Sequence, residues 1–253
     1  MRVTGKRHRL NIPLVACVAA LVPFQVGQVQ AIEGGAPARV GDRLAGATVA
    51  IGTVMQREDG FRISRCSGVL IAPDLVLTAA HCVRDNPVGA AVFFYRGSRL
   101  VRSPHRVASV IRHAYRPSAI TSSTLADKLD EVSLDTAILR LESPVRGRTP
   151  IRMAQNGQRL PPTLRMAGVG LSGRTAGTLR TTTLRPLAVS GNGLTIAHTV
   201  GTRACFGDSG GPVVMQSRNG PVLWGVASAV ITPQAPCGNI LMIAPVNPGG
   251  SRS

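Results

Sequence analysis

The segment that most constrains this chain is Cys205–Pro212, which reads Cys-Phe-Gly-Asp-Ser-Gly-Gly-Pro. It sets Ser209 between glycines and directly after an acidic residue. A serine hydroxyl becomes a good nucleophile when a neighbouring base takes its proton. Glycines let nearby backbone N–H groups turn toward an oxyanion. The segment therefore indicates a hydrolase, although its Gly-x-Ser-x-Gly spacing alone also fits the nucleophile turn of an α/β-hydrolase.

The order of the candidate residues along the chain separates these folds. An α/β-hydrolase needs a histidine after its serine, and no histidine follows Ser209. The order His, Asp, Ser finds good candidates instead. His81 ends an apolar stretch, and Asp135 opens an apolar run that continues to Leu141. Three nearby acidic residues compete with Asp135 but lack such a run: Asp127, Asp130 and Glu131.

Short β-rich runs recur between turn residues along the whole chain after residue 31. Many short strands with frequent glycine and proline favour an all-β sandwich or barrel. The expected strands are Thr48–Val54, Val69–Ile71, Leu75–Thr78, Val92–Tyr95, Val107–Arg112, Thr136–Leu141, Leu164–Val169, Leu194–Ala197, Pro212–Met215, Leu223–Val230 and Leu241–Ala244.

Three blocks in this order resemble the trypsin/chymotrypsin-like serine proteases: Cys66–Cys82, Asp135–Leu141 and Cys205–Pro212. The resemblance extends from about Ile32 to Val246. It implies an all-β fold of two six-stranded antiparallel barrels with the active site in the cleft between them. We expect the protease domain at residues 32–253, with the first barrel at about 32–145 and the second at about 146–247.

The resemblance also implies the roles of the site residues. Ser209 is the expected nucleophile, His81 the general base, and Asp135 the residue that orients the imidazole. The backbone N–H groups of Gly207 and Ser209 are expected to form the oxyanion hole. Peptide hydrolysis would run through an acyl-enzyme and needs no metal or cofactor.

Residues 1–31 read as a secretory signal peptide, with a basic start, an apolar centre and a small-residue cleavage site at Val29-Gln30-Ala31. We expect export, and we favour it over lipoprotein anchoring through Cys17. Cleavage after Ala31 would begin the mature chain at Ile32. In the resembled family a newly freed N-terminal amine pairs with the acidic residue before the nucleophile, which here is Asp208. Signal cleavage alone would then activate the enzyme. The alternative is that cleavage falls elsewhere and leaves a short propeptide.

Removal of the signal leaves four cysteines, which in an oxidising compartment allow three disulfide pairings. The resemblance selects Cys66–Cys82 and Cys205–Cys237. The spacing gives little support to a zinc site.

Specificity departs from the trypsin pattern. The position six residues before the nucleophile lies at the base of the family's specificity pocket, and here it is Arg203. Arg203 facing the pocket would favour acidic side chains, and Arg203 turned outward would leave a small or apolar pocket. The resembled substrate-binding segment contains Ser228, Ala229 and Val230, of which Val230 would narrow the pocket.

The formal net charge is +17, and basic residues are not interleaved with aromatics. We therefore expect no specific nucleic-acid partner. The expected partners are a protein or peptide substrate and, as further candidates, a proteinaceous inhibitor and an anionic surface, with the chain a monomer. A non-catalytic protease homologue that binds anionic partners is the alternative function, and an esterase for small acyl groups is a weaker one.

Overall fold

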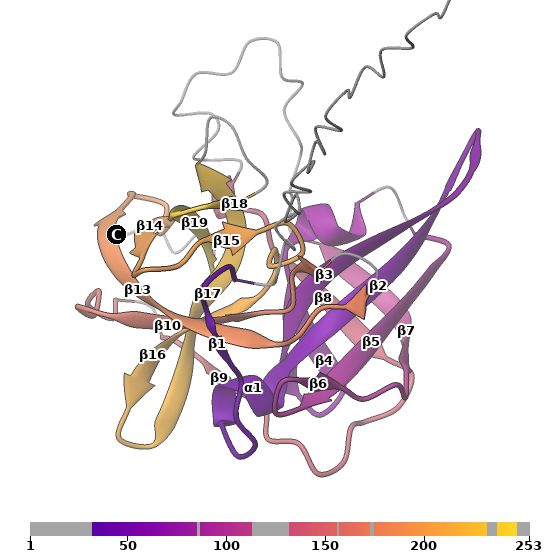
Figure 1. Cartoon of the computed structure of the whole chain (residues 1–253), viewed down its shortest axis with the longest axis horizontal. Helices are drawn as coiled ribbons and strands as arrows, with labels where there is room; N and C mark the ends of the chain where they lie inside the picture. Colours follow the sequence, from indigo (N-terminus) through magenta and orange to yellow (C-terminus); the bar gives the residue numbers. More distant parts are fainter. Residues whose placement is uncertain are drawn as a thin grey trace, which may run out of the picture.

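The computed structural model describes residues 32–84, 87–112, 132–155, 157–172, 175–231 and 237–246. Within them, two antiparallel β-barrels lie beside one another (Figure 1), the first in purple and pink and the second in orange and yellow. This arrangement confirms the all-β, two-barrel fold expected from the sequence. The expected signal peptide and Cys17 lie outside the described residues.

Six strands of the described chain close the first barrel, because β2 pairs with both β3 and β5. Alternate residues of β2, among them Val49, Ile51 and Thr53, point into the barrel and are buried, as expected for a strand with one buried face. A short strand, β6 (Arg99–Leu100), extends from β5. Around the barrel the strands are β2 (Thr48–Arg57), β3 (Gly60–Ala72), β4 (Leu75–Thr78), β8 (Ala137–Leu141), β7 (His105–Arg112) and β5 (Gly89–Arg96).

The second barrel closes in the same way, because β13 pairs with both β10 and β14. Two short strands join its outside: β1 (Ala36–Pro37) pairs with β13, and β9 (Arg152–Met153) runs parallel to β17. The six closing strands are β13 (Arg180–Val189), β10 (Leu164–Gly168), β16 (Pro212–Ser217), β17 (Gly220–Ile231), β19 (Ile240–Pro245) and β14 (Thr195–Thr199).

The remaining elements are short. Asp42 caps the helix α1 (Arg43–Ala47) by accepting the N–H of Leu44 at 2.9 Å. No helix in the described part of the chain is both long and apolar enough to cross a membrane. The other short elements are the 3-10 helix η1 (Ala80–Val83) and two strand pairs. In the first pair β11 (Leu171–Ser172) lies beside β12 (Thr175–Ala176), and in the second β15 (Ala204–Cys205) lies beside β18 (Cys237–Gly238).

Each expected strand overlaps an observed one, but besides the two-residue strands two longer features escaped the sequence pattern. β13 was not expected, because its buried positions include Thr182 beside Leu184 and its exposed positions mix Thr183 and Arg185 with apolar residues, so it shows no clear alternation. β3 begins nine residues before the expected start at Val69, because its first part is exposed and its apolar residues, Phe61 and Ile63, are separated by polar ones. The first described residues also belong with the second barrel rather than the first, since β1 pairs with β13 and Ile32 packs in the second core.

The two barrels are joined by packing and by a buried hydrogen bond. Val214 and Val226 of the second barrel pack into the same apolar core as the first-barrel strands. The Tyr95 hydroxyl on β5 donates to the carbonyl of Gly177 at 2.8 Å. Burial raises the pKa of Tyr95, so this phenol remains a donor at ordinary pH.

Replacing Tyr95 with phenylalanine should destabilise the fold by roughly 1–3 kcal/mol, because the buried Gly177 carbonyl would lose its donor. Chemical denaturation followed by tryptophan fluorescence would measure this loss. A matched control is Phe93→Leu, which removes ring volume from the same strand without touching the hydrogen bond. Equal stability of Tyr95→Phe and the parent would show that this hydrogen bond contributes nothing to the free energy of unfolding.

Candidate active site

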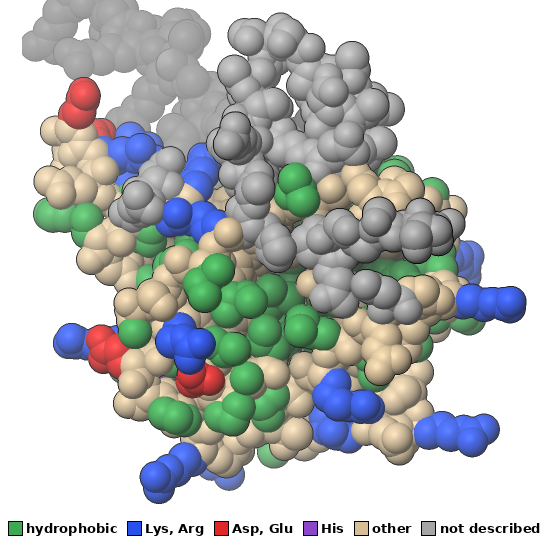
Figure 2. Space-filling model, turned by 180° about the vertical axis from the view of Figure 1, so that it is seen from behind, with side chains coloured by type: hydrophobic (Ala, Val, Ile, Leu, Met, Phe, Trp, Pro, Cys, Tyr) green, Lys and Arg blue, Asp and Glu red, His purple; other side chains and the backbone are tan. Residues whose placement is uncertain are grey.

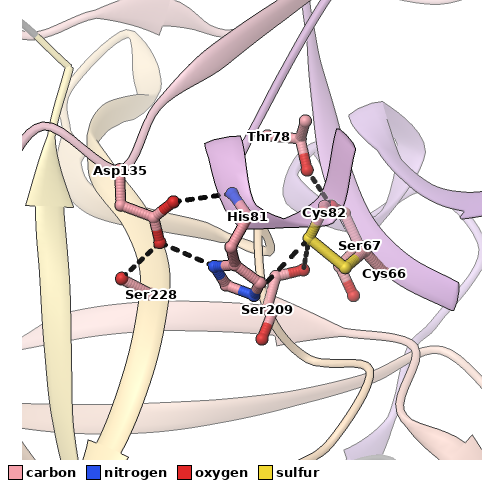
Figure 3. Close-up of polar contacts among 8 residues, drawn as sticks. All are labelled: Cys66, Ser67, Thr78, His81, Cys82, Asp135, Ser209 and Ser228. Carbon is pink, nitrogen blue, oxygen red and sulfur yellow. Dashed lines mark hydrogen bonds and ion pairs between the residues drawn. A yellow bond between two sulfur atoms is a disulfide. The ribbon is translucent and has the colours of Figure 1, made fainter. Parts of the chain in front are cut away.

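His81, Asp135 and Ser209 come from three separate elements that meet between the barrels (Figure 3). β4 leads directly into η1, which holds His81. Asp135 lies just before β8, and Ser209 lies in the loop between β15 and β16. The first barrel therefore supplies the imidazole and the carboxylate, and the second supplies the serine.

The Asp135 carboxylate holds His81 through both of its oxygens. Oδ1 accepts the His81 backbone N–H at 2.8 Å, and Oδ2 lies 2.7 Å from the ring Nδ1. The Ser228 hydroxyl donates to the same Oδ2. This arrangement orients the ring, and it favours the tautomer in which Nδ1 carries the hydrogen and Nε2 is an acceptor.

The Asp135 side chain is 2% exposed. Its burial opposes ionisation, but the hydrogen bonds from His81 and Ser228 and the nearby charge of His81 outweigh that effect and lower the pKa of Asp135. The carboxylate therefore stays charged at neutral pH and can stabilise a positive imidazole.

Ser209 and His81 line one cleft of about 690 Å³. The cleft continues on one side along β17 and on the other along the start of β3. The backbone carbonyl of Ser209 accepts a hydrogen bond from the Ser67 N–H at 2.8 Å. Its hydroxyl forms no hydrogen bond with His81 Nε2 in this arrangement. In unliganded enzymes such hydrogen bonds are often long and tighten when substrate binds.

The loop around Ser209 leaves two N–H groups available. Asp208, Gly210 and Gly211 donate their N–H groups to backbone carbonyls, whereas those of Gly207 and Ser209 have no acceptor in the described part of the chain. Gly207 has φ +89°, a conformation that side chains other than glycine adopt only with strain. These two N–H groups are the ones expected from the sequence to bind an oxyanion.

Ser67 fastens this loop to the first barrel, and sequence reasoning did not single it out. Its hydroxyl, which is buried, donates to the Gly207 carbonyl at 2.8 Å and accepts the Val169 N–H at 3.0 Å. Thr78 donates to the Ser67 carbonyl at 2.7 Å. The only signal in the sequence was its place beside Cys66 in the histidine block, since nothing local predicts a contact 140 residues away.

Asp208 is buried and accepts three backbone N–H groups. Oδ2 accepts those of Ile32 at 3.1 Å and Cys205 at 2.8 Å, and Oδ1 accepts that of Gly170 at 3.1 Å. Ile32 is fully buried beside it. The structure therefore brings together the two residues that the sequence predicted as a pair. Burial raises the pKa of Asp208 to about 7, although the three hydrogen bonds oppose this rise.

Gly168 makes room for this carboxylate. A Cβ at position 168 would lie 2.2 Å from Asp208 Oδ1, which is far closer than two atoms can approach without a bond. Gly168 was not a predicted site residue either, because a single glycine at the end of a strand carries no specific signal.

Arg203 lies away from the cleft. Its guanidinium pairs with Glu33 at 3.2 Å and donates to the Cys237 carbonyl at 2.9 Å. It lines a separate hollow with Glu33 and His198, whereas the cleft beside Ser209 is lined by Ser228, Ala229 and Val230. The outward of the two orientations considered for Arg203 is therefore the one observed, because Glu33 and a carbonyl hold the cation there. The wall of the cleft on this side is small and apolar, with Ala204, Ala229, Val230 and Leu241.

The two disulfides expected from the family resemblance are present. Cys66 is bonded to Cys82 and Cys205 to Cys237. The first bond ties the histidine helix to β3, and the second ties the serine loop to β18. In the chain-entropy description each loop of this size stabilises the fold by roughly 3 kcal/mol.

Two clusters of potential ligands occur in the described chain, and both consist largely of these bonded sulfurs: Cys66, His81 and Cys82, and Glu33, Cys205 and Cys237. Sulfurs joined in a disulfide are not thiolates, so neither cluster offers a metal its usual sulfur ligands. Two other histidines lie apart from the site: His105 packs edge-on against Phe94, and His198 lies 3.1 Å from the Asn239 amide. His113, Asp127, Asp130 and Glu131 lie outside the described residues.

Comparisons with known proteins agree with this fold. Residues 34–248 match the trypsin family. A curated trypsin of Sarcophaga bullata is 26% identical over 190 residues, which cover 65% of this chain and 70% of that protein. Among solved structures, HL collagenase superposes with a TM-score of 0.66 at 22% identity and covers 85% of this chain and 94% of its own.

Two inactivated protease paralogues of the scabies mite have the same fold. The first superposes with a TM-score of 0.60 at 22% identity, and the match covers 83% of this chain and 93% of the paralogue. The second superposes with a TM-score of 0.61 at 17% identity, and the match covers 84% of this chain and 92% of the paralogue. At sequence identities this low, the structural similarity shows a shared fold and nothing more.

The fold and the family match define a chymotrypsin-like serine protease architecture. The chain belongs to the trypsin family.

The buried Asp208 predicts a pH-dependent stability in a chain that still carries Ala31. Unfolded, Asp208 releases its proton near pH 4, whereas in the folded chain its pKa is about 7. The folded state therefore binds more protons across this window, and the unfolding free energy should fall as pH rises from about 4 to about 7, by up to roughly 1 kcal/mol per pH unit.

Denaturant titrations at several pH values measure this slope, and Asp208→Asn should remove it. A chain that begins at Ile32 should show a smaller slope, because an ammonium group beside Asp208 favours the charged carboxylate. The same slope in the Asp208→Asn variant would contradict the prediction.

Proposed function

We propose that this protein is a secreted serine endopeptidase with a Ser-His-Asp triad. The observation that carries the proposal is the 2.7 Å contact between His81 Nδ1 and the buried Asp135, in the same cleft as Ser209. Proteases of this family act on proteins or peptides. The two disulfides agree with an extracellular protein, and the sequence of residues 1–31 supplies the export signal.

The proposed reaction depends on the groups present in the cleft. His81 Nε2 takes the Ser209 proton as the serine oxygen attacks the substrate carbonyl, and Asp135 stabilises the imidazolium that forms. The imidazolium then gives its proton to the leaving amine, which departs and leaves an acyl-enzyme. A water molecule, deprotonated by the same histidine, hydrolyses the ester and restores Ser209.

The unpaired N–H groups of Gly207 and Ser209 would stabilise the oxyanion in both steps. One such donor is worth about 3–4 kcal/mol of barrier in a serine protease. Its value depends on an orientation that is set before substrate binds, and here Ser67 and Asp208 hold the loop on either side.

Activation would require only removal of the signal peptide. Cleavage after Ala31 would turn the buried Ile32 nitrogen, 3.1 Å from Asp208, into an ammonium group. A cation at this distance would offset the burial of the carboxylate and keep the serine loop in its present shape. The proposed enzyme therefore has no propeptide.

Small or apolar side chains are the proposed substrate preference on the acyl side. The cleft wall there contributes Ala229, Val230 and Leu241, whereas the Arg203 charge is engaged by Glu33. The sequence also suggested a preference for acidic substrate side chains, and this arrangement does not support it, because Arg203 does not line the cleft.

A non-catalytic homologue that binds anionic partners is the second candidate. It is favoured by the likeness to inactivated paralogues and by the arginine side chains that project from the face in Figure 2, where acidic side chains are few. The hydrogen-bonded His81 and Asp135 argue for catalysis, because a binding protein does not need them.

Labelling with a fluorophosphonate probe tests the proposed function. The exported protein should react at Ser209 and begin at Ile32 by N-terminal sequencing, and the Ser209→Ala variant should not react. No labelling of a protein that begins at Ile32 would favour the binding homologue. A different N-terminus together with absent labelling would indicate a propeptide.

The proposed specificity predicts two different responses to substitution. Arg203→Ala should change the ratio of kcat/KM values for Glu and Ala substrates by less than about twofold, because its charge lies outside the cleft. Val230→Gly should raise kcat/KM for Phe relative to Ala by at least about tenfold, the size expected when a few carbon atoms are removed from a pocket wall. Loss of Glu cleavage in Arg203→Ala would instead mean that Arg203 reads the substrate.

A further inference from the structure

The β2–β3 hairpin extends well beyond the first barrel (Figure 1). Near its tip Phe61 and Ile63 are each 70% exposed, although they are large apolar residues. The cleft that contains Ser209 runs directly onto this hairpin, where Met55 and the residues from Arg62 to Cys66 line it. The hairpin therefore forms one end of the cleft.

One edge of this hairpin is open. From Gly60 to Gly68 the strand β3 pairs with β2 alone, and its pairing with β4 begins at Val69. At Ser67 the other edge is occupied, because its N–H donates to the Ser209 carbonyl and its carbonyl accepts from Thr78. In the described chain the other edge has no partner strand from Gly60 to Cys66. An exposed sheet edge of this kind can bind an extended peptide by adding it as a further strand.

The charge of this end of the cleft is positive. Arg62 and Arg65 both line it and are both exposed. Arg62 contacts Asp59 at 3.2 Å, but both side chains are 68% exposed, so water weakens the pair. Arg65 has no ion-pair partner in the described chain, and the only acidic residue that lines the cleft there, Asp208, is buried and fully engaged by N–H groups.

The position of the hairpin relative to Ser209 decides which part of a substrate it meets. The acyl side would lie along Ser228–Val230 and the small apolar wall. Beyond Ser209 and His81 the cleft continues only toward the hairpin in the described residues. The substrate residues after the cleaved bond must therefore lie along β3.

We propose that the β2–β3 hairpin selects extended substrates with acidic residues on the leaving-group side of the cleaved bond. The main chain of the substrate would pair with the open edge of β3, and its carboxylates would face Arg62 and Arg65. This inference rests on the proposed protease function, and its test separates the two.

The test uses internally quenched peptides that are identical up to the cleaved bond and carry Asp, Asn or Lys at the second and third positions after it. At low ionic strength kcat/KM for the Asp peptide should exceed that for the Asn peptide by about three- to tenfold, the range expected for two exposed charge pairs. The advantage should shrink in about 0.5 M salt, because the ions screen exposed charges.

Substitutions assign this preference to the hairpin. In the double variant Arg62→Gln, Arg65→Gln the Asp/Asn ratio should fall to about one, and in Arg62→Glu, Arg65→Glu the Lys peptide should become the better substrate. The control is Arg185→Gln, which removes an exposed charge from β13, outside the cleft, and should leave the ratio unchanged. An unchanged ratio in the hairpin variants would overturn the inference.

A binding measurement keeps the inference separate from catalysis. The same peptides, labelled with a fluorophore, are titrated against the Ser209→Ala protein and followed by anisotropy. Preferred binding of the Asp peptide that depends on Arg62 and Arg65 supports the inference even if the parent hydrolyses nothing, in which case the proposed protease function fails. Hydrolysis of all three peptides at equal rates overturns the inference and leaves the protease function standing. Equal binding without hydrolysis overturns both.

Discussion

The buried carboxylate of Asp208 is the contact on which the geometry of the serine loop depends. It accepts N–H groups from Ile32, Gly170 and Cys205, so one side chain joins the start of the described chain, the second barrel and the loop that carries Ser209. A carboxylate buried without such partners would be strongly destabilising. In the proposed activation, cleavage of the bond before Ile32 would therefore act on the loop of Ser209, because it would change the charge that faces Asp208.

Both barrels contribute residues that hold the candidate site in place. The first orients His81 through Asp135, and it also reaches into the serine loop through Ser67, whose hydroxyl lies 2.8 Å from the Gly207 carbonyl. The second supplies Ser209 and returns a hydroxyl from Ser228 to Asp135. Because each barrel contributes hydrogen bonds to groups carried by the other, the site exists only when they are packed together.

The two ends of the cleft differ in chemistry. The acyl end is small and apolar, and the Arg203 charge that could have changed this is held outside by Glu33. The hairpin end carries Arg62 and Arg65 on an open strand edge. In the proposed protease, specificity would therefore depend more on the substrate residues after the cleaved bond than the pocket residues alone would indicate.

The sequence by itself determined the family and the barrel strands with clear apolar alternation, and through the family resemblance it predicted the disulfide pairs and the candidate catalytic residues His81, Asp135 and Ser209, because these depend on local patterns and on blocks in a recognisable order. It did not reveal β13, whose buried face includes threonine, or Ser67 and Gly168, whose importance arises from contacts with residues far along the chain. The sequence also did not decide whether the Arg203 side chain faces the pocket or points away from it. Only the tertiary structure decided these points, because a side chain's orientation and partners depend on which distant segments pack against it.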